Sequence, residues 1–140
     1  ERDETRAGEY YAEKFRSPDV DGRRAGDPGK PVKEPTGPER MRGVIRMYKR
    51  AFPQRELINE VIVCNDEFVI ARVRVKGVMD GPMGDYAPTG KPFEYTAIDM
   101  YRFNQEGKVF ERWGVADSGK FLREAGILQE APGVRLDEAD

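Results

Sequence analysis

One segment of the chain repeats apolar residues at the spacing of a helix. These residues are Met41, Val44, Ile45, Tyr48 and Phe52. Positions i, i+3, i+4, i+7 and i+11 fall on one face of an α-helix, so the pattern predicts an amphipathic helix. Pro38 suits its first turn, and Pro53 marks its end.

Four segments rich in β-branched and aromatic residues follow this helix. They are residues 57–63, 68–76, 93–103 and 109–115. Turn signals at 65–66 and 104–107 separate neighbouring segments, whereas residues 77–90 form a longer connection with four glycines. A helix followed by four consecutive strands predicts an α+β domain with an antiparallel sheet, and not a parallel βαβ fold.

Both ends of the chain are more polar than its middle. We expect residues 1–36 to form a polar segment with a long loop, in which residues 9–15 are a short helix. Asp117 and Ser118 begin a closing helix. Residues 129–140 form an acidic tail that we expect to be mobile. The predicted domain therefore spans residues 37–128.

The absence of histidine limits the chemistry of the chain. The 140 residues include one cysteine and no histidine, which argues against a zinc or haem site. Cys64 follows the apolar residues 61–63 and is predicted to be a small buried hydrophobe. Acid–base chemistry must come from carboxylates, tyrosines or lysines whose pKa values are set by burial.

Charge and hydropathy limit the partners. The 24 lysines and arginines nearly balance the 26 acidic residues, giving a net charge of -2, which does not favour nucleic-acid binding. No apolar run reaches the roughly 18 residues of a membrane span, and no signal peptide is visible. We therefore expect a cytoplasmic protein with no membrane partner. The chain begins at Glu1 without a methionine, which is compatible with a removed upstream segment.

Four short motifs stand in order between residues 37 and 127. They are Gly37-Pro38-Glu39 with Ala51-Phe52-Pro53, then Ala87-Pro88-Thr89-Gly90-Lys91, then Ile98-Asp99-Met100-Tyr101-Arg102-Phe103, then Gly107-Lys108-Val109 with Glu111-Arg112-Trp113. The set resembles the GPE…AFPD, PPTGK and IDIYRF…GKIVEHW segments of the SnoaL-like polyketide and ester cyclases. Each motif alone is weak, but their order and spacing together favour this fold.

The resemblance implies a strongly curved antiparallel sheet in an NTF2-like α+β cone, closed by helices, and a homodimer formed through the outer sheet face. Polyketide cyclases of this family close a ring by intramolecular aldol condensation, with an aspartate as acid–base residue and no metal or organic cofactor. The implied partner is a small apolar molecule. Related cone proteins are hydroxylases, dehydratases, epoxide hydrolases or ligand binders, so the fold leaves the reaction open.

The chain departs from the cyclase pattern at four positions. Gly114 stands where the acid–base aspartate follows the tryptophan, and Asp99 stands where the best-known cyclases carry a pocket histidine. Ala97 replaces a pocket glutamine, and Ser17 replaces an asparagine. The family's long first helix also lacks a counterpart, because residues 9–15 match the segment after it. Either the sequence is truncated or the pocket is covered differently.

Asp99 is the first candidate for catalysis. Strand alternation puts Tyr95, Ala97, Asp99 and Tyr101 on one face, which the resemblance directs into the cone. A carboxylate in an apolar pocket is expected to have a raised pKa and could exchange a proton with a carbon acid. The alternative is an ion pair that lowers this pKa; the possible partners are Arg72, Arg74 and Arg112.

The other candidates each have a structural alternative. Asp117 could supply the acid missing at Gly114, or it could cap the closing helix. Tyr95 and Tyr101 could hydrogen-bond an enolate or an aromatic ligand, or they could pack within the sheet. Arg112 could hold a carboxylate or an anionic ligand, or it could occupy an exposed strand position.

Further ligand contacts are expected at Gly114, Ser17 and Tyr10. Gly114 could widen the pocket, and Tyr10 could line its mouth or anchor the N-terminal segment. Trp113 is predicted to face outward. The methionines of residues 77–90 could form an adaptable rim over the pocket or belong to an ordinary connection.

Three hypotheses for function follow. The chain could be a cofactor-free enzyme that acts on an apolar carbonyl compound through Asp99. It could instead be a non-catalytic small-molecule binder, which Gly114 and the missing histidine favour. Finally, it could be an assembly domain that uses the outer face of its sheet.

Overall fold

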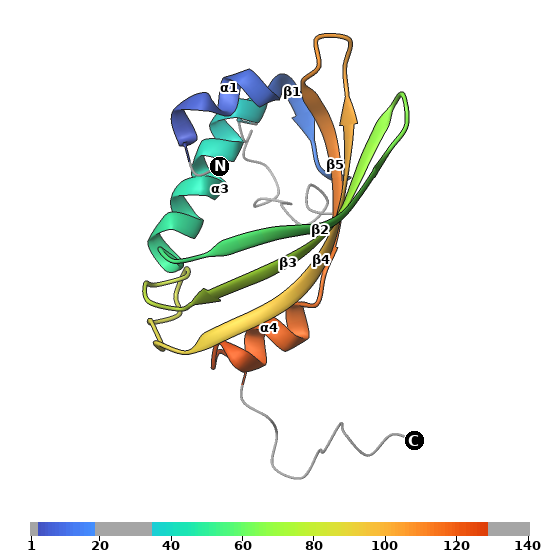
Figure 1. Cartoon of the computed structure of the whole chain (residues 1–140). Helices are drawn as coiled ribbons and strands as arrows, with labels where there is room; N and C mark the ends of the chain where they lie inside the picture. The colour runs from blue at the N-terminus through green and yellow to red at the C-terminus, as the bar shows by residue number, and fades with distance from the viewer. Residues whose placement is uncertain (1–2, 19–34, 129–140) are drawn as a thin grey trace.

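The computed structural model describes residues 3–18 and 35–128, so the predicted tail and most of the predicted N-terminal loop lie outside the described residues. Figure 1 shows one curved sheet with helices packed against it. In chain order the elements are the 3-10 helix η1 (Glu4–Arg6), α1 (Ala7–Tyr10), β1 (Tyr11–Arg16), α3 (Gly37–Ala51), β2 (Glu56–Cys64), β3 (Phe68–Val78), β4 (Pro92–Phe103), β5 (Val109–Ala116) and α4 (Ser118–Glu124).

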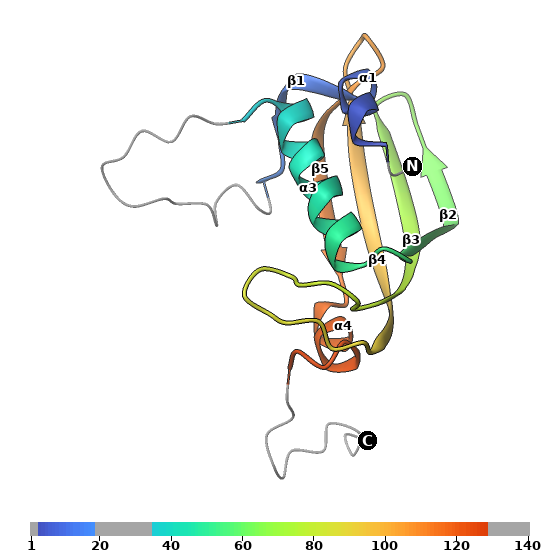
Figure 2. The ribbon, with the colours of Figure 1, turned by 90° about the vertical axis from the view of Figure 1, so that its left-hand side faces the viewer.

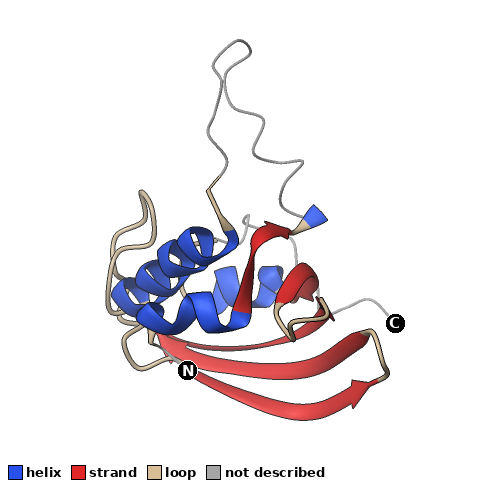
Figure 3. Cartoon of the chain, turned by 90° about the horizontal axis from the view of Figure 1, so that it is seen from above, coloured by secondary structure: helices blue, strands red, loops and turns tan. Residues whose placement is uncertain are grey.

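The five strands form one open mixed sheet in the order β1-β5-β4-β3-β2. Strands β2 to β5 pair antiparallel, as the sequence predicts, whereas β1 pairs with β5 in parallel. Register shifts between Asn59 and Val61 and between Arg102 and Phe103 interrupt the ladders. Such irregularities bend a strand and increase its twist. They accompany the strong curvature of the sheet in Figure 3.

The prediction of a helix over residues 9–15 is wrong, because α1 ends at Tyr10 and the chain continues as β1. This strand occupies the otherwise unpaired edge of β5. The side chain of Arg16 pairs there with Glu111, a carboxylate that is only 3% exposed. Tertiary pairing therefore overrides a weak local helix pattern.

Helix α3 confirms the segment predicted from its apolar stripe. Thr36 caps it in a capping box: the Glu39 N–H donates to Thr36 Oγ1 (3.4 Å), and the Thr36 N–H donates to Glu39 Oε2 (2.9 Å). Pro38 lies in the first turn, and Phe52 follows the last residue. Figures 2 and 3 show α3 lying across the inner, concave face of the sheet, with α4 closing one end.

Three phenylalanine rings join both helices to the sheet. Phe52 lies 4.9 Å from Phe93 and 5.8 Å from Phe121, and Phe93 lies 4.9 Å from Phe121, all measured between ring centroids. All three pairs are edge-to-face, the arrangement that aromatic quadrupoles favour. The buried core around them comprises Ala51, Phe52, Ala71, Val73, Val75, Met79, Phe93 and Ala125.

Two predictions about individual side chains are corrected by the fold. Cys64 is exposed and not buried, because it ends the edge strand β2, of which eight of the nine residues are exposed. Met79 is fully buried in the core, so it cannot belong to a rim over the pocket. Its carbonyl accepts hydrogen bonds from the N–H groups of Thr89 (3.2 Å) and Gly90 (2.9 Å), which hold this connection against the core.

None of the helices within the described ranges has the length and apolar character needed to cross a membrane.

Candidate functional site

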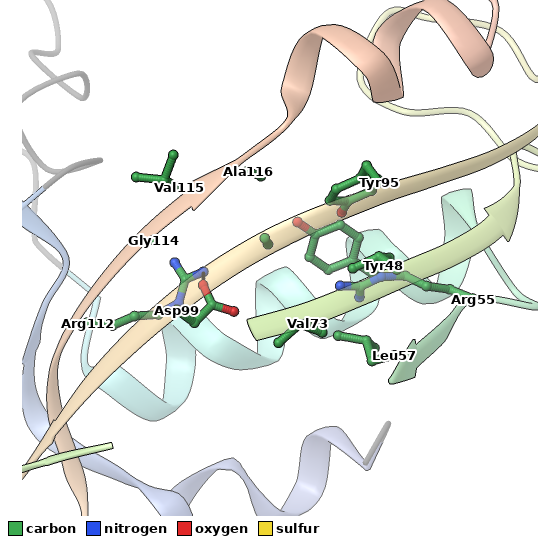
Figure 4. Close-up of a pocket in the computed structure, with 12 residues that line it drawn as sticks. Tyr48, Arg55, Leu57, Val73, Tyr95, Asp99, Arg112, Gly114, Val115 and Ala116 are labelled. Atoms are coloured by element: carbon green, nitrogen blue, oxygen red, sulfur yellow. Dashed lines mark hydrogen bonds and ion pairs between the residues drawn. The ribbon is translucent and has the colours of Figure 1, made fainter. Parts of the chain in front are cut away.

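A cavity of about 120 Å³ opens on the inner face of the sheet. Its floor comes from β3, β4 and β5, and the end of α3 and the start of β2 form one wall (Figure 4). The residues lining it are Tyr48, Arg55, Leu57, Val73, Val75, Tyr95, Ala97, Asp99, Arg112, Gly114, Val115 and Ala116. The strand alternation that the sequence predicts therefore places Tyr95, Ala97 and Asp99 in this cavity.

An ion pair between Asp99 and Arg112 lies at one end of the cavity. Asp99 is 9% exposed, and its Oδ1 accepts a hydrogen bond from the Nη2 of Arg112. Figure 4 shows the two side chains pointing toward each other. The hydroxyl of Tyr101 donates to the other oxygen, Oδ2, at 3.4 Å. Among the three arginines considered from the sequence, the structure brings Arg112 to Asp99, whereas Arg72 and Arg74 pair with Glu60.

Gly114 makes room for this ion pair. It lies directly opposite Asp99 in the β4–β5 ladder. A Cβ at position 114 would approach Asp99 Oδ1 to 2.6 Å and Arg112 Nη2 to 2.7 Å, closer than real Cβ contacts allow. The glycine therefore does not widen the pocket as predicted, because the charged groups of Asp99 and Arg112 fill the space that its missing side chain leaves.

The tyrosines around the ion pair keep their protons. Burial raises the pKa of Tyr101 to about 12, and the nearby Asp99 carboxylate adds to this effect. Burial also raises the pKa values of Tyr95 and Tyr11. Desolvation acts to lower the pKa of Arg112, but Asp99 and Tyr101 outweigh it, so that pKa is raised overall. At neutral pH the site therefore presents phenolic O–H donors and a charged guanidinium.

A second guanidinium, that of Arg55, lies on the wall formed by the end of α3. Its carbon Cζ lies 3.9 Å from the centroid of the Tyr48 ring. A cation over a tyrosine face is stabilised by about 0.5–2 kcal/mol, depending on how far it is desolvated. Arg55 was not predicted from the sequence. The sequence feature that could have indicated it is its position between Pro53, which ends the helix, and the next strand, where the chain turns back toward the sheet.

Three residues predicted to contact a ligand or to act in catalysis lie elsewhere. The Asp117 carboxylate is exposed and caps α4, accepting from the Lys120 N–H at 3.0 Å. Tyr10 is exposed beside Arg6, and Ser17 is buried just after β1. None of the three lines the cavity, and neither does Tyr101, whose hydroxyl contacts Asp99 instead. The structure thus confirms the alternative given for Asp117, a helix cap.

No group of three or more potential metal ligands occurs within residues 3–18 and 35–128. The one carboxylate of the cavity, Asp99, is bound to Arg112. The arrangement is therefore suited to holding a polar atom of a ligand between a carboxylate, a guanidinium and a phenol, beside an apolar surface.

The contact at Gly114 gives a stability prediction. We expect Gly114→Ala to lower the free energy of unfolding by about 1–3 kcal/mol, because the new methyl group forces Asp99 and Arg112 apart. Urea denaturation followed by circular dichroism measures the change. The matched control is Gly43→Ala in α3, where a Cβ meets nothing within 4 Å and the substitution is expected to be neutral or stabilising. A Gly114→Ala variant that is as stable as the wild type would contradict the contact.

The raised pKa of Tyr101 gives a pH prediction. An unfolded tyrosine ionises near pH 10, whereas folded Tyr101 holds its proton to about 12. The folded state therefore binds more protons over this interval, and stability is lost as the pH rises from about 10 to 12. We expect Tyr101→Phe to weaken this loss and Tyr86→Phe, at an exposed position, to leave it unchanged. Urea denaturation at pH 9 and pH 11 tests both; an unaltered slope in Tyr101→Phe would refute the assignment.

Comparisons with known proteins place this chain in a family. The family model described as SnoaL-like polyketide cyclase matches residues 1–125. No curated protein sequence matches the chain significantly.

Several solved structures share the NTF2-like α+β fold. TsrD from Streptomyces laurentii superposes with a TM-score of 0.73 at 22% identity, covering 91% of this chain and 85% of its own. IdmH from Streptomyces antibioticus, a candidate polyketide cyclase, has a TM-score of 0.66 at 27% identity, with 89% and 87% covered. AclR from Streptomyces galilaeus, a candidate hydroxylase, has a TM-score of 0.64 at 21% identity, with 89% and 71% covered. With the family model matched over most of its length, the chain belongs to the SnoaL-like polyketide cyclase family.

Proposed function

We propose that the cavity carries out cofactor-free acid–base chemistry on a small apolar carbonyl compound, with Asp99 as the base. The observation that carries this proposal is the buried Asp99 carboxylate, which lines the cavity together with Arg112 and apolar strand residues. Membership of a family named for polyketide cyclases supports a carbonyl compound as the ligand.

The proposed reaction begins with removal of a proton from the carbon next to the carbonyl group. Asp99 takes the proton, and the electron pair of the broken C–H bond moves to the carbonyl oxygen to give an enolate. Arg112 and Tyr95 line the same cavity and act as donors to this oxygen. Because burial raises the pKa of Tyr95, its hydroxyl keeps the proton that it donates in this hydrogen bond.

Ring closure completes the cycle with no other reactant. The enolate carbon attacks a second carbonyl carbon of the same molecule, and a C–C bond forms while the C=O π bond breaks. The resulting alkoxide takes back the proton from Asp99, so the product is an isomer of the substrate. Tyr101 acts as a positioning residue here, because its hydroxyl holds Oδ2 of Asp99 while Arg112 holds Oδ1.

A non-catalytic binding module is the second candidate. It is favoured by the engagement of both Asp99 oxygens with protein donors, and by Gly114 where the resemblance expects the cyclase acid. Hydroxylase, dehydratase and epoxide hydrolase activities remain alternatives for the same cavity. The similarity to AclR, a candidate hydroxylase, rests on fold alone at 21% identity. A cytoplasmic location remains a prediction from the sequence.

The proposed base leads to a test on a defined probe. We expect the protein to accelerate exchange of the methylene protons of ethyl benzoylacetate in D2O, measured by NMR. Asp99→Asn is expected to lower the protein-dependent rate by about 10²–10⁴-fold, the usual contribution of a general base.

The control for this test is Asp66→Asn, which removes an exposed carboxylate from the turn before β3. It is expected to keep the wild-type exchange rate, and circular dichroism checks that both variants fold. A folded Asp99→Asn protein with full activity would sink the assignment of the base. Saturable binding of the probe without accelerated exchange in the wild type would favour the binding module.

We also propose that two chains associate through the outer face of the sheet. All described helices lie on the inner face, so the outer face has no cover within the described chain (Figure 3). Val63, Ile70, Met100 and Trp113 follow one another across four strands there, beside Ile98, which is 53% exposed. An uncovered apolar row of this kind is typical of a protein–protein contact.

Sedimentation equilibrium tests the proposed dimer. We expect the wild type to sediment with twice the mass of the chain and Ile98→Glu to sediment as a monomer, since the new charge would be buried without a partner. The matched control is Ile62→Glu on the inner face of β2, where the isoleucine is 57% exposed. A wild-type monomer, or an Ile98→Glu dimer, would contradict this interface.

A further inference from the structure

The end of the cavity away from Asp99 carries an arginine that the proposed reaction does not use. Arg55 follows the turn at the end of α3, and Figure 4 shows its guanidinium against the ring of Tyr48, across the cavity from Asp99 and Arg112. The turn is fixed by a hydrogen bond from the Arg55 N–H to the carbonyl of Phe52 (3.0 Å), beside the aromatic core. The side chain is therefore held in place from both its backbone and its planar face.

The charge of Arg55 has no carboxylate partner within the described residues. No carboxylate oxygen in residues 3–18 and 35–128 lies within 4.0 Å of its guanidinium. Its Nε is buried and lacks a hydrogen-bond acceptor there. Besides the ring of Tyr48, it interacts in the cavity with the phenol of Tyr95. Burial raises the pKa of Tyr95, and the nearby Arg55 acts to lower it by a smaller amount. A guanidinium with a buried, unused donor is an incomplete site for an anion.

The balance of charges in the cavity lining also favours an anionic ligand. Its lining holds two guanidiniums, Arg55 and Arg112, but a single carboxylate, Asp99. Asp99 is already paired with Arg112 at its own end. The unbalanced positive charge of the cavity therefore lies at the Arg55 end, next to two tyrosine rings.

We propose that the ligand of this cavity carries a carboxylate, and that Arg55 binds it. This inference rests on the proposed function in one respect, namely that the cavity is a ligand site. A guanidinium presents parallel N–H donors that match the two oxygens of a carboxylate, and stacking on Tyr48 orients its plane.

This placement orients the rest of the ligand. With its carboxylate at Arg55, the apolar body lies over the strand residues between the two charged ends, Val73, Val75 and Ala97. The far end of the ligand then reaches Asp99 and Arg112. An acidic ligand is therefore held with its carbonyl end at the base, and Arg55 acts as a specificity residue and not as a catalytic residue.

A pair of probes that differ only in charge tests this inference on the full chain. 2-Naphthoate carries the carboxylate, and 2-naphthamide has the same ring with a neutral group of similar size. Binding is measured by the fluorescence of the naphthalene ring. We expect the wild type to prefer the acid by about tenfold or more, the range of a charge-assisted, desolvated pair. We expect Arg55→Gln to bring the two affinities to within about threefold of each other, while the affinity for the amide is retained.

Two further variants separate the role of Arg55 from general charge and folding effects. Arg50→Gln removes an exposed positive charge from the end of α3, the helix that precedes Arg55. It is expected to leave the preference for the acid unchanged. Arg55→Lys keeps the charge without the planar fork and is expected to give an intermediate preference. Retained amide binding shows that each variant keeps the cavity.

The outcomes distinguish this inference from the proposed function. Equal affinity of the wild type for both probes, or an unchanged preference in Arg55→Gln, overturns the carboxylate site and leaves the ligand cavity standing. Failure of the wild type to bind either probe contradicts the cavity as a ligand site, and with it both proposals.

Discussion

The meeting of Asp99 and Arg112 depends on the absence of a side chain at position 114. These residues come from β4 and β5, and Gly114 is the direct ladder partner of Asp99. Any Cβ at this position would enter the space of both charged groups. A carboxylate that is 9% exposed is costly without a partner, so the glycine, the ion pair and the polar end of the cavity form one unit.

This constraint changes the meaning of the departure from the cyclase pattern. From the sequence alone, Gly114 in place of an acidic residue indicates a lost function or a wider pocket. In the folded chain it lets the neighbouring strand supply a carboxylate held by two donors, Arg112 and Tyr101. The acidic group of the cavity therefore comes from Asp99 on β4, and its position is set by residues from both strands.

The packing at the other end of the cavity has a separate origin. The edge-to-face contacts of Phe52, Phe93 and Phe121 join α3, β4 and α4. They fix the point where α3 ends, and the chain then turns through Arg55 into β2. Because the same turn places the guanidinium on Tyr48, the aromatic core determines where the second positive charge of the cavity lies.

Local pattern determined α3 and the strands β2 to β5, but not their surroundings. The stripe ending at Phe52 predicted α3, and the alternation through Asp99 predicted which residues of β4 face inward, because both depend only on the repeat of the backbone. Asp117 as a helix cap was likewise a local property.

Tertiary structure decided what sequence neighbours cannot show. It decided that β1 is a strand, that Cys64 is exposed, that Arg112 and not Arg72 or Arg74 meets Asp99, and that Arg55 enters the cavity. Each of these depends on contacts between segments distant in the chain, which arise only when the sheet curves and the helices close on it.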